Sequence, residues 1–137
     1  MLEQIMNSST FDYLQRGLSA AQLRQEVISN NIANVNTPHF KKSDVVFESL
    51  LAKEMGLDKE YRLQMVRTQD RHLPKPIEGK AQATILRQDT TSMRTDKNNV
   101  DIDVEMAGLA KNQIYFGAMA KELGSYIQRV KTTISSK

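Results

Sequence analysis

The chain of 137 residues contains no cysteine and no tryptophan, and only 6% of its residues are aromatic. The absence of cysteine excludes disulfides, thiolate nucleophiles and thiolate metal sites. No continuous apolar run is long enough to cross a membrane. The first residues, Met1 to Met6, carry neither the basic region nor the apolar block of a cleavable signal. If the protein leaves the cytoplasm, we expect it to use a route that needs no such signal.

Side chains that support catalysis or metal binding are also sparse. The two histidines, His39 and His72, are far apart and lack a neighbouring pattern of carboxylate ligands. The acidic run from Asp96 to Glu105 has neither the glycine nor the ligand spacing of a calcium loop, and helix capping explains it better. No phosphate-binding glycine loop or nucleophile elbow is present. The sequence therefore predicts no catalytic residue, no cofactor and no metal site, and we do not expect an enzyme.

The charge balance is slightly basic, with 19 Lys and Arg against 16 Asp and Glu. The excess lies in residues 52–97, where ten basic and seven acidic side chains alternate rather than form a block. Interleaved charge is typical of a solvated surface, whereas a phosphate-binding patch gathers one sign. A nucleic-acid-binding module is therefore a rival interpretation that the charge pattern disfavours. The composition, 39% hydrophobic and 26% charged, suits one small folded unit.

The first regular segment runs from about Thr10 to Asn36 and has the heptad pattern of a coiled-coil helix. Ser8, Ser9 and Thr10 are candidate N-cap residues. The spacing alternates between three and four along one stripe, which consists of Phe11, Leu14, Leu18, Ala21, Gln25, Ile28, Ile32 and Val35.

The last segment, of about 35 residues, repeats this pattern and predicts a second long helix. Its small residues, including Gly108, Gly117 and Gly124, would let neighbouring helices approach closely. Each stripe holds one glutamine, Gln25 or Gln113, which either fixes the register of a buried seam or marks a half-exposed one. The second stripe consists of Ile102, Met106, Leu109, Gln113, Phe116, Ala120, Leu123, Ile127, Val130 and Ile134.

The sequence between these helices is less regular. We expect a short amphipathic helix near residues 43–55 that ends at Gly56, strands near 61–68 and 81–87, and an extended segment at 72–76. The predicted fold is mainly α, with long N- and C-terminal helices that pair as an antiparallel coiled coil. A short, irregular, partly β segment joins them. The predicted divisions of this single structural unit are 1–36, 37–97 and 98–137. Because two helices cannot enclose a seam, each should leave apolar surface for another chain.

Four asparagines crowd the end of the first helix in the sequence NNIANVNTPHF. Asn30 and Asn34 lie one turn apart, so their amides can bond carbonyls of their own helix end and donors on an adjoining chain. Pro38 disfavours the helical conformation at Thr37, so the chain must turn there.

Residues 31–41, NIANVNTPHFK, resemble the N-terminal signature NIAN-x-x-TPGY of bacterial flagellar rod and hook proteins. The run NNVDIDVEM at 98–106, followed by Leu109-Ala110-Lys111-Asn112 and Tyr115, resembles a proximal rod subunit of that family. The likeness covers essentially the whole chain, including Arg67-Thr68 and His72-Leu73. Where the family has glycine and tyrosine, this chain has His39 and Phe40. The turn is therefore either type II, with a positive φ at His39, or type I.

The resemblance implies a structural subunit of the flagellar basal-body proximal rod that assembles through its terminal helices into a tubular drive shaft at the inner-membrane ring. It implies a periplasmic location and export by the flagellar type III apparatus without a cleaved signal peptide. The implied partners are further copies, the rod proteins FlgC, FlgF and FlgG, the rod–MS-ring junction protein FliE, the MS ring and the export gate, with no nucleic acid and no direct membrane span. The alternatives are the sister proximal rod subunit FlgC itself and an autonomous coiled-coil adaptor.

Three sets of residues carry these expectations. The first set should pack between subunits: Leu14, Leu18, Ile28, Ile32, Val35, Ile102, Met106, Leu109, Phe116, Leu123, Ile127 and Val130. The second set forms the rod-signature turn: Asn30, Asn31, Asn34, Asn36, Thr37, Pro38, His39 and Phe40. The third set is a candidate export-gate element, Phe47 and Leu51, whose spacing core packing explains equally well.

Overall fold

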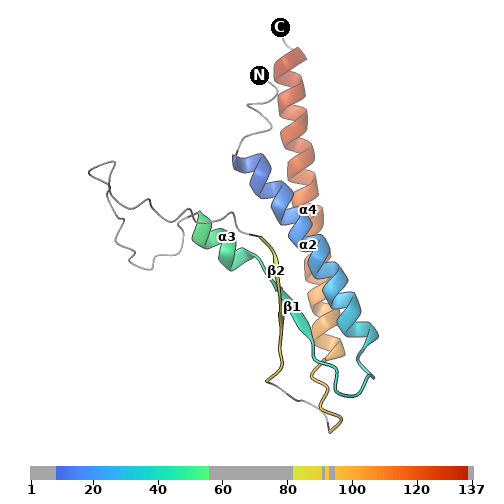
Figure 1. Cartoon of the computed structure of the whole chain (residues 1–137). Coiled ribbons are helices and arrows are strands. Elements are labelled where there is room, and N and C mark those ends of the chain that lie inside the picture. Colours follow the sequence, from blue (N-terminus) through green and yellow to red (C-terminus); the bar gives the residue numbers. More distant parts are fainter. Residues whose placement is uncertain (1–8, 56–81, 91, 93–94, 136–137) are drawn as a thin grey trace, which may run out of the picture.

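The computed structural model describes residues 9–55, 82–90, 92 and 95–135. In chain order its elements are helix α2 (Ser9–Ala33), strand β1 (Ser43–Val46), helix α3 (Glu48–Glu54), strand β2 (Thr84–Arg87) and helix α4 (Ile102–Ser135). Helices α2 and α4 run antiparallel along each other, so that the start of α2 and the end of α4 lie at the same end of the molecule (Figure 1). The expected pairing of the N- and C-terminal helices is confirmed.

Both terminal helices form where the heptad patterns predict them. Helix α2 has 25 residues and carries Asp12 in its first turn, and α4 has 34 residues and carries Asp103 and Glu105 in its first turn. Acidic side chains at a helix start interact favourably with the helix dipole. At 1.5 Å per residue, the helices are about 38 Å and about 51 Å long. Among the described residues, none of the helices α2, α3 and α4 is both long and apolar enough to span a bilayer.

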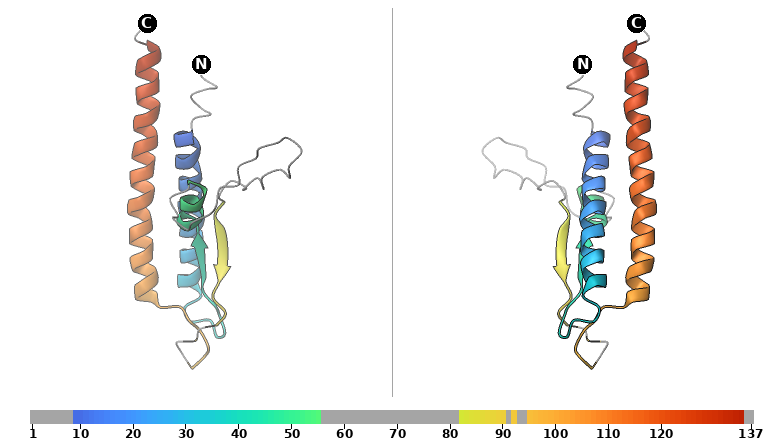
Figure 2. Two further views of the ribbon diagram at one scale, coloured as in Figure 1. Left: turned by 90° about the vertical axis from the view of Figure 1, so that its left-hand side faces the viewer. Right: turned by 90° about the vertical axis from the view of Figure 1, so that its right-hand side faces the viewer.

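Strands β1 and β2 form a two-stranded antiparallel sheet in which Ser43 pairs with Arg87 and Val46 with Thr84. Strand β1 also packs on α2, and Figure 2 shows α4 on one side of α2 and the strands displaced toward the other. The strand expected near 81–87 is therefore found, four residues long. The expected strand at 61–68, the extended segment at 72–76 and the helix end at Gly56 lie outside the described residues.

The prediction of a helix near 43–55 is correct only for the second half of that segment. Residues Ser43–Val46 are a strand, and the helix begins at Glu48. Along the strand Val45 is buried and Asp44 is exposed, which is the alternation of a half-buried strand. Two β-branched valines in succession and backbone pairing with β2 favour the extended conformation at this point.

The core described by the structure is small and belongs mainly to α2 and the segment after it. Its buried apolar side chains are Ala20, Ala21, Val27, Ile28, Val45, Phe47 and Val100. Helix α4 contributes no buried large apolar residue, and its two buried residues are Glu105 and Asn112. Glu105, Gly108 and Asn112 therefore make the first part of the contact between the two long helices with small and polar groups, and Met119 and Tyr126 continue it toward the end of α4. An ordinary coiled-coil seam is apolar throughout.

Close approach of the helices at Gly17 gives a test of this packing. A Cβ atom at Gly17 would lie 2.8 Å from Sδ of Met119, whereas one at Gly117 would have no neighbour within 4 Å among the described atoms. We expect Gly17→Leu to lower the free energy of unfolding by about 1–3 kcal/mol because it overpacks the contact. The matched variant Gly117→Leu should raise it by up to about 1 kcal/mol through helix propensity. Urea unfolding followed by circular dichroism measures both, and equal effects would contradict this packing.

Candidate assembly surface and the amide junction

Three asparagines are the largest fully buried side chains in the described structure: Asn31, Asn98 and Asn99 are 1%, 0% and 2% exposed. They lie where the end of α2, the start of β1 and the start of α4 meet. We call these three residues, together with Lys42, Ser43 and Glu105, the amide junction. Buried amides are tolerated only where their donors and acceptors are satisfied, so each set of partners reveals a structural role.

Asn98 joins the approach to α4 to the end of α2. Its Nδ2 donates to the carbonyl oxygens of Asn34, Val35 and Thr37 at 3.1, 3.1 and 2.9 Å. Its Oδ1 accepts a hydrogen bond from the Val100 backbone N–H at 2.7 Å. These carbonyls belong to the turn that follows α2, where the regular bonds of a helix are not available. One side chain therefore caps α2 from a point more than sixty residues later in the sequence.

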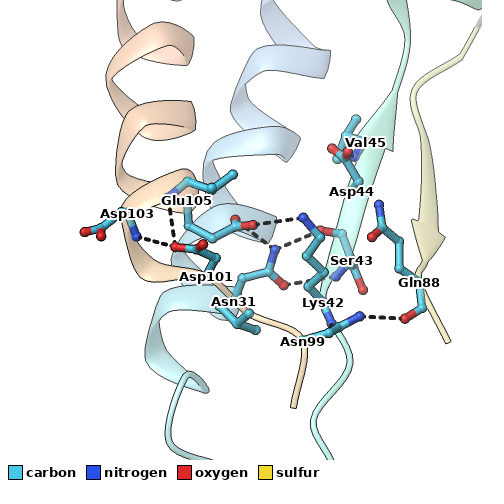
Figure 3. Close-up of polar contacts among 12 residues, drawn as sticks. Asn31, Lys42, Ser43, Asp44, Val45, Gln88, Asn99, Asp101, Asp103 and Glu105 are labelled. Carbon is cyan, nitrogen blue, oxygen red and sulfur yellow. Dashed lines mark hydrogen bonds and ion pairs between the residues drawn. The ribbon is translucent and has the colours of Figure 1, made fainter. Parts of the chain in front are cut away.

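Asn31 connects three elements (Figure 3). Its Nδ2 donates to the Ser43 carbonyl oxygen at 2.8 Å and to Oε2 of Glu105 at 3.0 Å, and its Oδ1 accepts from the Ser43 N–H at 3.0 Å. The amide thus satisfies both backbone groups of the first residue of β1. Helix α2, strand β1 and helix α4 are fixed to one another at this point.

Asn99 and Lys42 extend the junction toward β2. Oδ1 of Asn99 accepts from the Lys42 backbone N–H at 2.7 Å, and its Nδ2 donates to the Gln88 carbonyl oxygen at 2.9 Å. Nζ of Lys42 lies 3.7 Å from Oε1 of the buried Glu105, so this carboxylate has a cation as well as an amide donor beside it. A buried carboxylate requires such compensation.

The turn after α2 is resolved as type II. The Phe40 N–H bonds the Thr37 carbonyl at 3.3 Å, Pro38 occupies the second position, and His39 has φ 62° in the third. This combination defines a type II turn, which the sequence left open against type I. The His39 N–H also bonds the Asp96 carbonyl at 2.9 Å, beside a second residue with positive φ, Lys97 at 63°.

The other signature asparagines lie nearer the surface. Asn34 donates through Nδ2 to the Asn30 carbonyl at 2.8 Å, so it bonds a carbonyl of its own helix end as expected. Its Oδ1 accepts from Oγ1 of Thr37 at 3.2 Å. Asn30 and Asn36 are exposed, as are Pro38 and His39. Contacts of these exposed residues with another chain stay a prediction.

Helix α4 faces α2 with a stripe displaced by one position from the predicted seam. Glu105 meets Asn31, Gly108 lies near Cδ1 of Ile28, and Nδ2 of Asn112 donates to the Ala21 carbonyl at 2.8 Å. Nearer the end of α4, Met119 lies against Gly17, and the Tyr126 ring centroid is 6.2 Å from that of Phe11. The predicted seam contains the residue that follows each of these five: Met106, Leu109, Gln113, Ala120 and Ile127.

The predicted seam of α4 consequently forms one flank of the helix instead of its contact with α2. Most of the exposed large hydrophobic residues in the described chain belong to α4: Ile102, Val104, Met106, Ile114, Tyr115, Phe116, Ile127 and Ile134. Of the seam residues, Leu109, Leu123 and Val130 are half-buried. We call the stripe from Ile102 to Ile134 the α4 seam. A continuous exposed apolar surface of this kind marks an interaction site.

The predicted packing residues of α2 have a different environment. Ile28 is buried, and Leu14, Leu18, Ile32 and Val35 are half-buried. None of them is among the exposed large hydrophobic side chains. These α2 side chains therefore pack mostly against other residues of the same chain. Helix α4 consequently offers a partner the larger exposed apolar surface.

Phe47 and Leu51, the candidate export-gate element, pack inside the described fold. Phe47 is 4% exposed and Leu51 is half-buried. Both line an apolar pocket of about 230 Å³ together with Leu14 and Met119. In the folded chain these two side chains perform core packing, which is the alternative that the sequence left open.

An ion pair anchors α3 to α2. The Arg24 guanidinium donates to both carboxylate oxygens of Glu48 at 2.6 Å and to the Val45 carbonyl at 3.1 Å. The hydrogen bonds from Arg24 hold the pKa of Glu48 below its ordinary value, and the same contact raises the pKa of Arg24. Because the Glu48 side chain is 62% exposed, solvent screens much of this interaction.

Sequence reasoning found Asn31 but assigned no buried role to the junction residues near α4. Asn98, Asn99 and Asn112 appeared only within family motifs, and Glu105 appeared only in a motif and as a helix-capping acid. The available signal was a pair of adjacent asparagines before an acidic helix start, which could have been read as buried amides serving another helix end. Over the part of the chain that the structure describes, no three His, Asp or Glu side chains gather where they could hold a metal ion.

The model of the family described as flagella basal body rod protein matches residues 11–41. The chain is 35% identical over 128 residues to the flagellar basal body rod protein FlgB of Bacillus subtilis, covering 93% of this chain and 95% of the relative. It is 33% identical to FlgB of Borreliella burgdorferi, with coverages of 90% and 93%. It is 31% identical over 136 residues to FlgB of Proteus mirabilis, with 98% of both chains covered.

Proposed function

Because this chain belongs to the FlgB family of flagellar basal body rod proteins, we propose that it joins the rod through the α4 seam. The chain is a structural subunit of the basal body rod and not an enzyme. The sister subunit FlgC is not favoured as an alternative, since the curated relatives matched over nearly the whole chain are FlgB proteins.

One observation carries the proposal about the seam. Helix α4 leaves Ile102, Met106, Phe116, Ile127 and Ile134 between 43% and 53% exposed, while a different stripe of the helix faces its own α2. Burial of apolar surface contributes roughly 25 cal/mol per Å², so a covering helix would find its main stabilisation here. An autonomous adaptor, the remaining alternative, would use this surface to form a small closed oligomer.

Substitution in the seam tests this role. In cells whose own gene copy is replaced by a variant, we expect Ile127→Glu to abolish swimming and rod formation. A charge buried in an apolar interface costs several kcal/mol, which corresponds to a roughly 100-fold or larger loss of association. The adjacent Gln128→Glu, outside the seam, should leave swimming intact. The measurements are swimming-plate diameter and basal bodies counted by electron microscopy. Equal behaviour of the two variants would remove the seam from the assembly surface.

The neighbours of the subunit and its route to the rod belong to the same proposal. On the family resemblance we propose contacts with further copies and with FlgC, FlgF, FlgG, FliE, the MS ring and the export gate. We propose a periplasmic rod location reached through the type III apparatus. The exposed signature residues Asn30, Asn36 and His39 would meet neighbouring chains at the tip of the helix pair.

Export-gate recognition by Phe47 and Leu51 would occur before folding, because Phe47 is almost fully buried in the folded chain. We expect Phe47→Ala to reduce the amount of chain that leaves the cytoplasm by at least about tenfold. The half-buried Phe40→Ala, outside the element, is the control for loss of an aromatic side chain. Quantitative immunoblots of cytoplasmic and periplasmic fractions measure the export. Normal export of the Phe47 variant would exclude the gate role.

A further inference from the structure

Among the described residues, strand β1 pairs with β2 along one edge, and it lies between β2 and α4 (Figure 2). The Gln88 N–H bonds the Lys42 carbonyl at 3.0 Å, and in an antiparallel ladder the residues whose backbone groups face the partner strand alternate. The backbone groups of Ser43 and Val45 therefore point away from β2. A strand edge of this kind is a template for pairing with a strand of another chain.

Side chains already occupy this second edge of β1. The Asn31 amide accepts from the Ser43 N–H at 3.0 Å and donates to the Ser43 carbonyl at 2.8 Å. Nη2 of Arg24 donates to the Val45 carbonyl at 3.1 Å, and the Val45 N–H donates to Oδ1 of Asp44 at 2.8 Å. Seven residues, or about two helical turns, separate Arg24 from Asn31, so both reach β1 from one face of α2. The backbone groups that point away from β2 are thus bonded to side chains of the same molecule.

Space for a further strand exists beside this edge. A groove of about 590 Å³ lies between β1 and α4; residues 42–46 line one side, and α4 from Val104 to Tyr115 lines the other. This wall of α4 is about 16 Å long, whereas four extended residues span about 13 Å. The groove is therefore long enough for a strand of the length of β1. Hydrogen bonding, and not steric exclusion, closes the edge.

We propose that Arg24, Asn31 and Asp44 form an edge guard, a set of side chains that keeps β1 closed to a strand from a second copy. Two of its three members belong to α2, so the edge closes when α2 docks on β1. A chain in which α2 is not docked would expose the backbone groups of Ser43 and Val45 to pairing. The guard contains no residue of the α4 seam, and this inference is therefore independent of the proposed assembly.

Opening the edge at Val45 tests the guard without disturbing the amide junction. The double variant Arg24→Met with Asp44→Ala removes both side-chain partners of Val45 and leaves the bonds of Asn31 in place. It also keeps the formal net charge at +3, since it loses one cation and one anion. In the purified full chain, we expect thioflavin T fluorescence to rise at least about tenfold faster than in the natural chain, because an edge with unpaired backbone groups recruits strands. An unchanged rate would overturn the guard.

A proline at position 45 is the matched reversal. In the background of the double variant, Val45→Pro removes the N–H that an added strand would need. This N–H points away from β2, so β1 and β2 keep their own hydrogen bonds, and proline is tolerated at such an edge. We expect the rate to return to that of the natural chain. Persistent fast growth would place the pairing at another edge and contradict the proposal.

Three further controls separate edge opening from other causes. Glu48→Gln removes the ion pair with Arg24 but leaves the bond of Arg24 to Val45, and it should not accelerate growth. Gly17→Leu loosens the contact between α2 and α4, and it should grow more slowly than the double variant when the two are compared at equal free energy of unfolding. Adding Ile127→Glu to the double variant should not slow growth, because it acts on the α4 seam. Fast growth of either single variant, or slower growth with Ile127→Glu, would assign the effect to the ion pair, to general unfolding or to the seam, and would overturn the edge guard.

Discussion

Replacing Asn98 by alanine is expected to lower the free energy of unfolding by about 3–5 kcal/mol. The substitution removes the donor shared by three carbonyl oxygens and the acceptor for the Val100 N–H, in a side chain that is 0% exposed. Each buried polar group left without a partner costs about 1–3 kcal/mol, and partial entry of water lowers the sum. Urea unfolding of the purified chain, followed by helical circular dichroism, measures the change.

Asn36→Ala is the matched control for this variant. Asn36 belongs to the same group of signature asparagines but is exposed, so its replacement should change the free energy of unfolding by no more than about 0.5 kcal/mol. A loss below 1 kcal/mol in the Asn98 variant would mean that the end of α2 does not depend on the amide junction.

The second large effect is expected from Asn31→Asp. The change places a carboxylate about 3.0 Å from Oε2 of Glu105, in a site where both residues are buried. It also removes the donor to the Ser43 carbonyl. Two like charges without an intervening donor should destabilise the chain by about 3–5 kcal/mol, the loss typical of a buried charge deprived of its partner. The free energy of unfolding at neutral pH measures the effect.

A double variant tests the cause of that loss. Adding Glu105→Gln to Asn31→Asp removes one charge and provides an amide that can donate to the new carboxylate. We expect this pair to recover at least half of the lost stability. The exposed Asn30→Asp controls for the added charge alone and should be nearly neutral. No recovery in the double variant would show that the Ser43 contacts, and not charge repulsion, dominate at Asn31.

The two long helices could be predicted from the sequence because their signal is local. Helix α2 begins at Ser9, one residue before the expected start, and ends three residues before Asn36. Helix α4 begins at Ile102, the first residue of the predicted stripe. Strand β1 could not be predicted in the same way. Its conformation depends on backbone pairing with Thr84–Arg87 and on the amide of Asn31, both distant in sequence. Periodicity within a short window does not contain this information.

The side of α4 that faces α2 could not be predicted from the sequence pattern either. The heptad argument assumes that the most apolar stripe faces the nearest helix. In the folded chain the bonds of Asn31 to Glu105 and of Asn112 to Ala21, with the close approach at Gly17, turn the neighbouring and more polar stripe toward α2 instead. The use of the stripe from Ile102 to Ile134 for packing between subunits stays a prediction. Its position on a flank follows from polar contacts that periodicity does not reveal.

The bond between His39 and Asp96 has an evolutionary consequence. It joins two turns whose residues His39 and Lys97 both have left-handed backbones, at φ 62° and 63°. Glycine adopts that region freely, and asparagine, aspartate and histidine do so more readily than other residues, so Lys97 occupies it at a cost of about 1–2 kcal/mol. Inherited changes at position 39 should therefore be confined to this small set.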